Sequence, residues 1–292
     1  LSGHFLVSLD ESVVLADSRY LLQAEEECPD SRVVLLTGAL RDAWPELVAG
    51  LRSIGGAPGG VEGGGVRRIG VEAGFLSHAA WLQLEEAAPD LELVAVEGLV
   101  ERQRATKEPT ELERVAAACA IADAALEATL TDITEVLLFD FGARVAGYRS
   151  DMTRTLFVGA PTERDLAVYE VVARAQAEAI EVVRSALREG RELTNREVDA
   201  AARRVIEAGG HGAHFGHGTG HGIGLATHEL PSLGRTAPEE ALPARTVFSI
   251  EPGIYLAGAT GVRIEDLAAI DRERGTLELL TRFPREVTVV SA

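Results

Sequence analysis

The first hundred residues alternate short apolar runs with helix-type patterns. Five runs rich in Val and Leu and bounded by turn residues are typical of strands: His4–Leu9, Ser12–Ala16, Val33–Thr37, Arg67–Glu72 and Leu91–Val96. The segments between them favour helices: Ser18–Cys28, Leu40–Ser53 and Ser77–Ala88, with Ser18 and Ser77 as candidate N-caps. This order of elements predicts a small α/β domain.

A second region begins with a long helical pattern that runs from Thr106 to Leu130. We place the domain boundary just before it, which gives domains 1–105 and 106–292. The remainder predicts helices at Glu163–Glu189 and Thr194–Ala208 and glycine-rich strands at 212–228, 246–256 and 261–271. This mixture contains no βαβ repeats, so it predicts an α+β arrangement.

One sequence pattern that predicts the start of a helix is not followed by a helical pattern. Asp132 followed three residues later by Glu135 is an N-terminal capping pattern, yet Val136–Phe139 continues directly as a strand. Coincidence would explain this, and so would residues missing from the sequence between Glu135 and Val136. We expect the second explanation, with a longer polypeptide and Cα atoms at that peptide further apart than the roughly 3.8 Å of a trans bond.

The composition of the chain excludes some classes of binding partner. The chain has 292 residues, of which 46% are apolar and 25% charged, a balance typical of globular proteins. The formal net charge of −18 would repel nucleic acids and anionic membrane surfaces, so we expect neither as a partner. Cys28 and Cys119 lie in helical patterns and are interpreted as packing residues. With no disulfide framework and no secretory signal in view, we expect a cytoplasmic protein.

The first unusual segment is Phe139–Thr155, which reads as a hairpin. A loop centred between Val145 and Ala146 would set Asp140 directly opposite Asp151. Two carboxylates opposed in this way destabilise a sheet unless a cation lies between them.

A second hairpin repeats this arrangement. In Ser249–Asp266, a loop centred on Gly258 would set Glu251 opposite Glu265. Each pair taken alone could be a solvated sheet edge. Two pairs together predict four converging carboxylates, which suit a pair of divalent cations.

The third segment is rich in histidine. Five of the seven histidines lie within Gly210–Glu229, among glycines that allow close backbone approach. His228-Glu229 lacks the second His of a zincin helix, the glycines lack dinucleotide-binding spacing, and there is no G-x-S-x-G elbow. Four carboxylates with one or two imidazoles favour Mn²⁺ and accept Zn²⁺ or Co²⁺. Two such ions a few Å apart are the machinery of metal-assisted amide hydrolysis.

These motifs resemble the pita-bread metallopeptidases. The resemblance rests on Asp140 and Asp151 in D-x-G…S-D-x-T-R-T, followed by H-G-T-G-H-G-I-G-L-x-x-H-E, S-I-E-P-G-I-Y and G-V-R-I-E-D. The group contains aminopeptidase P, prolidase, methionine aminopeptidase and the metal-free creatinase. Leu15–Leu21 is similar to part of the creatinase-type amino-terminal domain. The resemblance implies such a domain followed by a pita-bread catalytic domain.

The resemblance also implies site residues. The metal ligands would be Asp140, Asp151, His221, Glu251 and Glu265, with Asp151 and Glu265 bridging the two ions. Glu251 would also be the proton shuttle. His228 would stabilise the tetrahedral intermediate, His217 would help to hold the substrate, and Arg263 would orient the bridging carboxylates. His211 and His214 match no family position and are interpreted as structural.

The implied function is hydrolysis of the Xaa-Pro bond at the amino end of dipeptides or short peptides. His228-Glu-Leu-Pro-Ser-Leu resembles the bacterial dipeptidases slightly more than aminopeptidase P, which acts on longer peptides and stays as the alternative. A non-catalytic binding protein of the same fold is the other alternative. Relatives normally carry a further stretch, with a substrate-facing His, at the place where Glu135 meets Val136 in this sequence. We also expect a homodimer.

Overall fold

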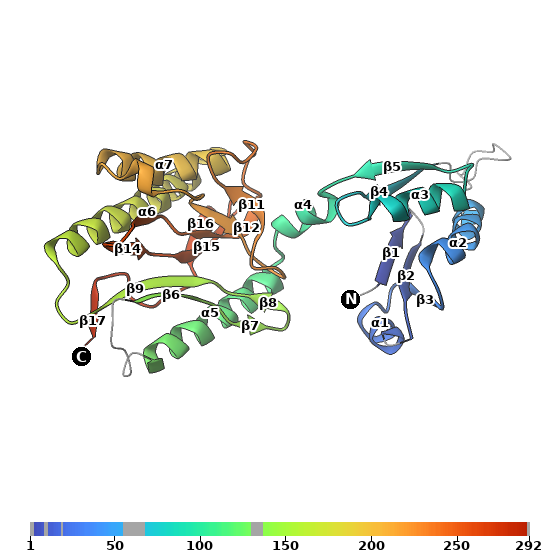
Figure 1. Ribbon diagram of the computed structural model, residues 1–292, viewed down its shortest axis with the longest axis horizontal. Coiled ribbons are helices and arrows are strands. Elements are labelled where there is room, and N and C mark those ends of the chain that lie inside the picture. Colours follow the sequence, from blue (N-terminus) through green and yellow to red (C-terminus); the bar gives the residue numbers. More distant parts are fainter. Residues whose placement is uncertain (1–2, 9–10, 19, 55–67, 130–136, 291–292) are drawn as a thin grey trace. The chain divides into compact units, whose positions relative to one another are not determined.

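The computed structural model describes residues 3–8, 11–18, 20–54, 68–129 and 137–290. The chain break predicted between Glu135 and Val136 lies outside these ranges. The chain divides into two compact units, Leu1–Leu99 and Val100–Ala292, and the boundary comes a few residues before the expected position at 105 (Figure 1). Each unit is described by itself. Among the helices in the described ranges, none is both long and apolar enough to cross a bilayer.

The first unit contains two small sheets, and its strands begin and end within two residues of the predicted bounds. β1 (Gly3–Val7) pairs antiparallel with β2 (Ser12–Ala16), which pairs in parallel with β3 (Arg32–Leu35). β4 (Arg68–Glu72) and β5 (Glu92–Val96) form a separate parallel pair. This unit therefore has the small α/β architecture predicted from its apolar runs.

Three helices accompany these strands: α1 (Leu21–Glu27), α2 (Leu40–Ile54) and α3 (His78–Ala87). The N-cap predicted for α3 is confirmed, because the hydroxyl of Ser77 accepts the N–H of Ala80 at 3.2 Å. The N-cap predicted for α1 is wrong. The N–H of Tyr20 donates to the carbonyl of Asp17 in a turn, so the helix begins only after Tyr20 and Ser18 cannot cap it.

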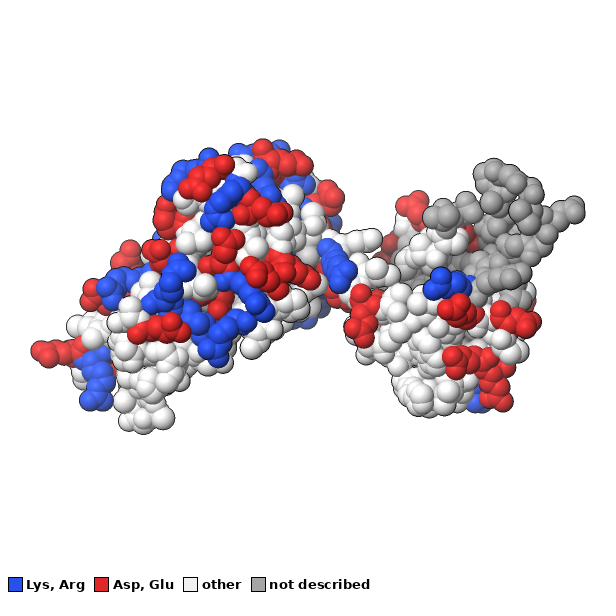
Figure 2. All heavy atoms as spheres, turned by 90° about the horizontal axis from the view of Figure 1, so that it is seen from above, with Lys and Arg blue, Asp and Glu red and all other residues white. Residues whose placement is uncertain are grey.

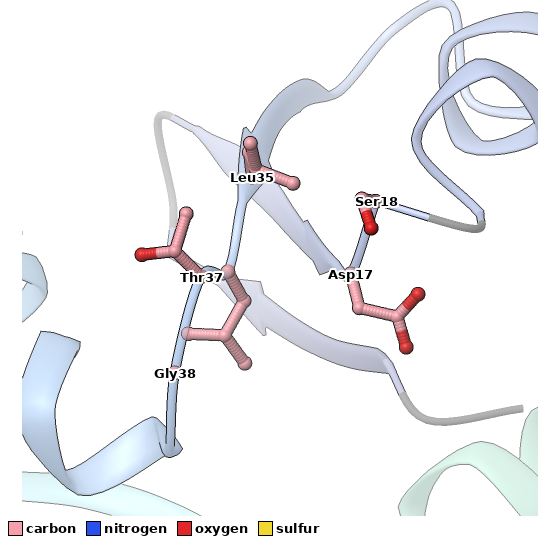
Figure 3. Close-up of a pocket in the computed structure, with 6 residues that line it drawn as sticks. Asp17, Ser18, Leu35, Thr37 and Gly38 are labelled. Carbon is pink, nitrogen blue, oxygen red and sulfur yellow. The ribbon is translucent and has the colours of Figure 1, made fainter.

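The core of the first unit joins α2 and α3 to β5 through Trp44, Val48, Leu84, Leu91 and Leu93. At the carboxyl ends of β2 and β3 lies a hollow of about 440 Å³ (Figure 3). Its lining consists of Asp17, Ser18, Leu35, Leu36, Thr37 and Gly38. A single carboxylate does not make a metal site, so the chemistry has to be sought in the second unit.

The second unit begins with α4 (Leu99–Ala105), a helix that the sequence analysis did not predict. It is followed by α5 (Pro109–Thr129), which starts later than the predicted Thr106 because Pro109 occupies the first helical position. Two further helices follow the sheet strands of the first hairpin: α6 (Glu163–Glu189) and α7 (Asn195–Ala208).

The predicted bounds of α6 and α7 are confirmed, and both helices start with a capping box. The hydroxyl of Thr162 accepts the N–H of Asp165 while the Asp165 carboxylate accepts the N–H of Thr162. Thr194 and Glu197 do the same for α7. The two helices lie side by side (Figure 1) and bury a shared apolar core against the sheets. Such local signals explain why these bounds can be predicted from the sequence.

Two main sheets complete the second unit. A three-stranded sheet has the order β17-β9-β6, and a five-stranded antiparallel sheet has the order β11-β10-β12-β15-β16. Short hairpins β7–β8 and β13–β14 extend from them. The bounds are β6 (Leu137–Phe141), β7 (Arg144–Val145), β8 (Tyr148–Arg149), β9 (Met152–Val158), β10 (Gly220–Gly222), β11 (Glu229–Leu233), β12 (Arg245–Ile250), β13 (Gly253–Leu256), β14 (Thr260–Arg263), β15 (Asp266–Asp271), β16 (Thr276–Leu279) and β17 (Thr288–Val290).

The predicted strand at 212–228 is mostly wrong. That segment contains a single turn of 3-10 helix (η2, Gly212–His214), the short strand β10 and loops. Its glycines let the backbone pass close to neighbouring strands: a Cβ at Gly220 would lie 1.9 Å from the carbonyl oxygen of Ser249. The glycines therefore serve close approach to β12 rather than strand continuity.

Candidate metal centre

The first hairpin, β6–β9, has a register different from the predicted one. Asp140 lies opposite Thr153, not opposite Asp151. The turn is centred one residue later than expected, between Ala146 and Gly147, whose φ angles are +47° and +89°. A turn centred earlier would have placed the β-branched Val145 in a left-handed conformation, which is unfavourable.

This correction leaves Asp140 and Asp151 on the same face of the hairpin. Moving the turn centre by one residue changes each pairing partner by two, and side chains two apart on a strand share a face. The two carboxylates are therefore diagonal neighbours. Burial, and then the charge of Asp140, raise the pKa of Asp151 to about 6. The charge of Asp140 thus acts on Asp151, although the two residues are not the directly opposed pair that was predicted.

The register predicted for the second hairpin is confirmed. The pairs on either side of the two glutamates are Ile250 with Asp266 and Gly253 with Arg263. This common register sets Glu251 opposite Glu265, with Gly258 at the turn in a left-handed conformation (φ +71°). The backbone N–H groups of the two glutamates bond outside the hairpin, to the carbonyls of Thr219 and Thr153.

β10 brings His221 to these carboxylates. Its Nδ1 lies 3.0 Å from the carbonyl oxygen of Gly222, so Nδ1 carries a proton and donates it there. Nε2 then faces the acidic side chains, at 3.2 Å from Glu251 Oε1 and 3.9 Å from Asp151 Oδ2. Burial lowers the pKa of His221, but the hydrogen bond to Glu251 and the carboxylate charges outweigh it, and the pKa is raised.

Three of the predicted ligands form one compact cluster. One ligand atom each of Asp151, His221 and Glu265 lies within 4.8 Å of the others. Glu251 adjoins this cluster through His221. Asp140 lies at the rim, with half of its side-chain surface exposed. The arrangement offers carboxylate oxygens and an imidazole nitrogen, the donors that divalent first-row metals prefer.

Glu265 is the most constrained member of the cluster. It is fully buried, and the hydroxyl of Thr153 donates to its Oε2 at 2.6 Å. Its Oε1 has no hydrogen-bond partner within the described part of the chain. Burial, followed by the charges of Glu251 and Asp151, raises the pKa of Glu265 well above its usual value. A buried oxygen without a partner, in a group of like charges, fits a cation as the missing partner.

Arg263 connects the two hairpins. Its Nη2 donates to Asp140, its Nε donates to the hydroxyl of Thr153 at 3.0 Å, and its Nη1 donates to the hydroxyl of Tyr255 at 3.0 Å. The Tyr255 hydroxyl also lies 3.0 Å from His217 Nε2. The predicted Arg263 and His217 thus belong to one hydrogen-bonded chain that runs through Tyr255, a residue to which the sequence analysis gave no role.

His228 lies over the cluster. Its ring centroid is 4.0 Å from that of His221, with an angle of 39° between the rings. Burial, and then the charge of His221, lower the pKa of His228. His211 and His214 contact each other at η2, with ring centroids 6.2 Å apart.

Behind the cluster lies a buried hydrogen-bonded network that the sequence patterns did not predict. The guanidinium of Arg154 is fully buried and donates to the carbonyls of Thr153 and Glu265 and to the carboxylate of Asp266. Gln176 donates to the other oxygen of Asp266 at 3.0 Å. The signal in the sequence was an Arg inside an otherwise uncharged strand, where a charge is retained only with partners.

Comparison with known proteins places both units in families. The family model of metallopeptidase family M24 matches residues 116–272, and the model of the creatinase/prolidase N-terminal domain matches residues 2–106. The Xaa-Pro dipeptidase of Pyrococcus furiosus is 30% identical over 270 residues, which cover 75% of this chain and 75% of that protein. The 270 aligned positions outnumber the residues of this chain that they cover. The relative therefore contains residues that have no counterpart in this chain.

Two solved structures extend the similarity to nearly the whole chain. The Xaa-Pro dipeptidase from Bacillus anthracis has a TM-score of 0.84 at 27% identity, over 99% of this chain and 90% of that one. The X-Pro aminopeptidase from Thermotoga maritima has a TM-score of 0.81 at 25% identity, with the same shares covered.

Proposed function

The chain belongs to metallopeptidase family M24, and from this premise we propose that it hydrolyses the Xaa-Pro bond of dipeptides. The observation that carries the proposal is the cluster of Asp151, His221 and Glu265, in which one buried oxygen of Glu265 has no hydrogen-bond partner among the described residues. The dipeptidases of Pyrococcus furiosus and Bacillus anthracis support the substrate class. The two units, Leu1–Leu99 and Val100–Ala292, would be the amino-terminal and catalytic domains.

We assign the metal ligands to Asp140, Asp151, His221, Glu251 and Glu265. Two divalent ions suit this set of four carboxylates and one imidazole, with Mn²⁺ preferred and Zn²⁺ or Co²⁺ accepted. When bound, such a pair polarises a peptide carbonyl and activates water. The family resemblance implies that Asp151 and Glu265 would bridge the two ions. Their burial in the cluster and their raised pKa values, which a cation would reverse, support them as ligands.

The other side chains act on protons and on the substrate. Glu251 is the proposed proton carrier, since its Oε1 already accepts a hydrogen bond from Ser249 at 3.0 Å beside His221. His228 is close enough to the cluster to donate to the oxygen on which charge develops. His217, oriented by Tyr255, is placed to hold the substrate.

Dipeptides are the preferred substrate in this proposal. A dipeptidase must hold the free carboxylate of proline, whereas aminopeptidase P must leave room for a longer product. The Thermotoga maritima structure supports aminopeptidase P as the second candidate. The test compares kcat/KM for Ala-Pro and for Ala-Pro-Ala with Mn²⁺ supplied. A higher value for Ala-Pro is expected, and a higher value for Ala-Pro-Ala would replace the proposal by the alternative.

Peptides are also the partners that fit the charge of the protein. Acidic and basic side chains are interspersed over the visible face of the second unit, at the left of Figure 2. Together with the net charge of −18, this gives nucleic acid no basic surface on that face. The cytoplasmic location and the homodimer stay predictions. Sedimentation of the purified protein would test the latter.

A further inference from the structure

The loop that carries His228 is residues 223–228, between β10 and β11, and we call it the His228 loop. Within the described part of the chain, the His228 ring makes no hydrogen bond. The His228 ring contacts the ring of His221, and the two ring centroids are 4.0 Å apart. The position of the ring is therefore decided by the backbone of its loop and by whatever holds that backbone.

Glu229 folds back beneath this loop. Its Oε2 accepts the backbone N–H of Ala226 at 3.2 Å and the guanidinium of Arg104. Its Oε1 accepts the ammonium of Lys107 at 2.8 Å. Only 4% of the Glu229 side chain and 1% of the Lys107 side chain are exposed. The residue directly after His228 is thus a buried carboxylate with two cations.

The loop is shaped to admit these side chains. A Cβ at Gly224 would lie 2.5 Å from Glu229 Oε1 and 3.2 Å from Lys107 Cε, so any side chain there would displace the Glu229 carboxylate. On the opposite side, the backbone N–H of Arg149 donates to the carbonyl of Gly224 at 2.8 Å, and its Nε donates to the carbonyl of Leu225 at 3.2 Å. Carboxylate and hairpin together hold the loop from both sides.

The cations are themselves attached to the sheet of the site. The backbone N–H of Lys107 donates to the carbonyl of Arg245 at 2.8 Å, at the start of β12, and β12 leads to Glu251. Lys107 Nζ also donates to the carbonyl of Arg104. A buried ion pair adds little net stability compared with apolar side chains of similar size. The role of this ion pair is instead to fix one position of the His228 loop against β12.

We infer that Glu229 is a positioning residue for His228, and that Lys107 and Arg104 fix its carboxylate. This inference rests on the proposed role of His228 in stabilising negative charge during hydrolysis. Glu229 itself does not touch the substrate. Its effect is transmitted through the backbone that it shares with His228.

The experiment is a double-mutant cycle on the metal-loaded protein, with kcat, KM and metal content measured for Glu229→Gln, His228→Ala and the double variant. We expect Glu229→Gln to lower kcat by roughly tenfold or more, since a displacement of about 1 Å can cost about a hundredfold. Metal content and KM should change little. In the His228→Ala background, Glu229→Gln should have no further effect on kcat.

Glu11→Gln is the control, because it also removes a partly buried carboxylate paired with an arginine, Arg32, and it lies in the first unit, whereas the Glu229 network lies in the second. It should leave kcat unchanged and cost only stability. If Glu229→Gln does not fold, Lys107→Met carries the same test, since it frees Glu229 Oε1 while Arg104 still neutralises the buried carboxylate. If the two substitutions lower kcat independently, the double variant loses the product of the two single losses. That result would overturn the inference but not the proposed role of His228. An unchanged kcat in His228→Ala would overturn both the inference and the proposed role of His228.

Discussion

The two hairpins that supply the carboxylates bring them together by different pairings. In the second hairpin, Glu251 and Glu265 are opposed directly, and both are largely buried. In the first, Asp140 and Asp151 are diagonal neighbours, and Asp140 has Thr153 opposite it. The first hairpin therefore supplies one buried carboxylate, that of Asp151, and one half-exposed carboxylate, that of Asp140. The hydroxyl of Thr153 lies between these carboxylates and the second hairpin.

This difference shows what the Thr153 hydroxyl does. It donates to Glu265 at 2.6 Å and accepts from Arg263 at 3.0 Å, so it joins the two hairpins across the cluster. The comparison predicts that the four carboxylates are not equivalent, and that the cost of losing each should follow its burial.

The largest effect is expected from Glu265→Gln. The change removes a charge from the fully buried carboxylate, so metal affinity should fall by more than the roughly 10- to 100-fold that changes to outer partners cost. Activity should be lost with the metal. The metal-free variant should melt higher than the metal-free parent, because a buried charge is gone. Metal analysis and thermal melting test this, with Glu278→Gln on the exposed side of β16 as control.

A smaller and graded effect should separate the two aspartates of the first hairpin. Asp151→Asn should reduce metal content more than Asp140→Asn, since the Asp151 side chain is 11% exposed and that of Asp140 is 50% exposed. Titration of each metal-free variant with Mn²⁺ gives the comparison. Equal losses would mean that the diagonal pairing does not rank the ligands.

The pH dependence of the metal-free protein is the third test. Asp151 has its pKa raised from 3.8 to about 6, so the folded chain binds more protons than the unfolded chain between these values. Stability should therefore fall as the pH rises through this window, by at most about 3 kcal/mol for this group. The raised pKa of His221 acts in the same direction.

Thermal melting after chelation, at about pH 5 and about pH 7.5, measures this dependence. Asp151→Asn should reduce the difference between the two conditions, and the raised pKa values of Glu265 and His221 should account for the part that remains. A chelated protein that is more stable at the higher pH would contradict the carboxylate crowding described above.

The smallest effects should come from the two turns. Gly147→Ala and Gly258→Ala each place a side chain at positive φ, at a cost of about 1 kcal/mol. A Cβ at Gly258 meets nothing within 4 Å, whereas one at Gly147 lies 3.4 Å from Leu225 in the His228 loop. A contact of 3.4 Å with the end of an exposed side chain is an ordinary van der Waals contact, so neither substitution should change kcat. Gly74→Ala, with open space and no positive φ, is the control for both in denaturant unfolding.

Much of the chemistry could be predicted despite the register error in the first hairpin. Side chains alternate faces with a period of two, and the error changed each partner by two, so Asp140 and Asp151 stayed on one face. The glycine at the second turn fixed the other register correctly. The register of the first hairpin was predicted wrongly because it depends on the position of the turn, and several residues between the two strands could form that turn.

The sequence by itself determined the residue types, the faces of the hairpins and the capped helices α6 and α7, because these follow from neighbouring residues and the backbone geometry of regular elements. Tertiary structure decided which oxygens are buried and what holds them. Arg154 contacts the backbone of Glu265 across 111 residues, and Lys107 contacts Glu229 across 122. Such contacts depend on how the sheets pack, and no local pattern contains that information.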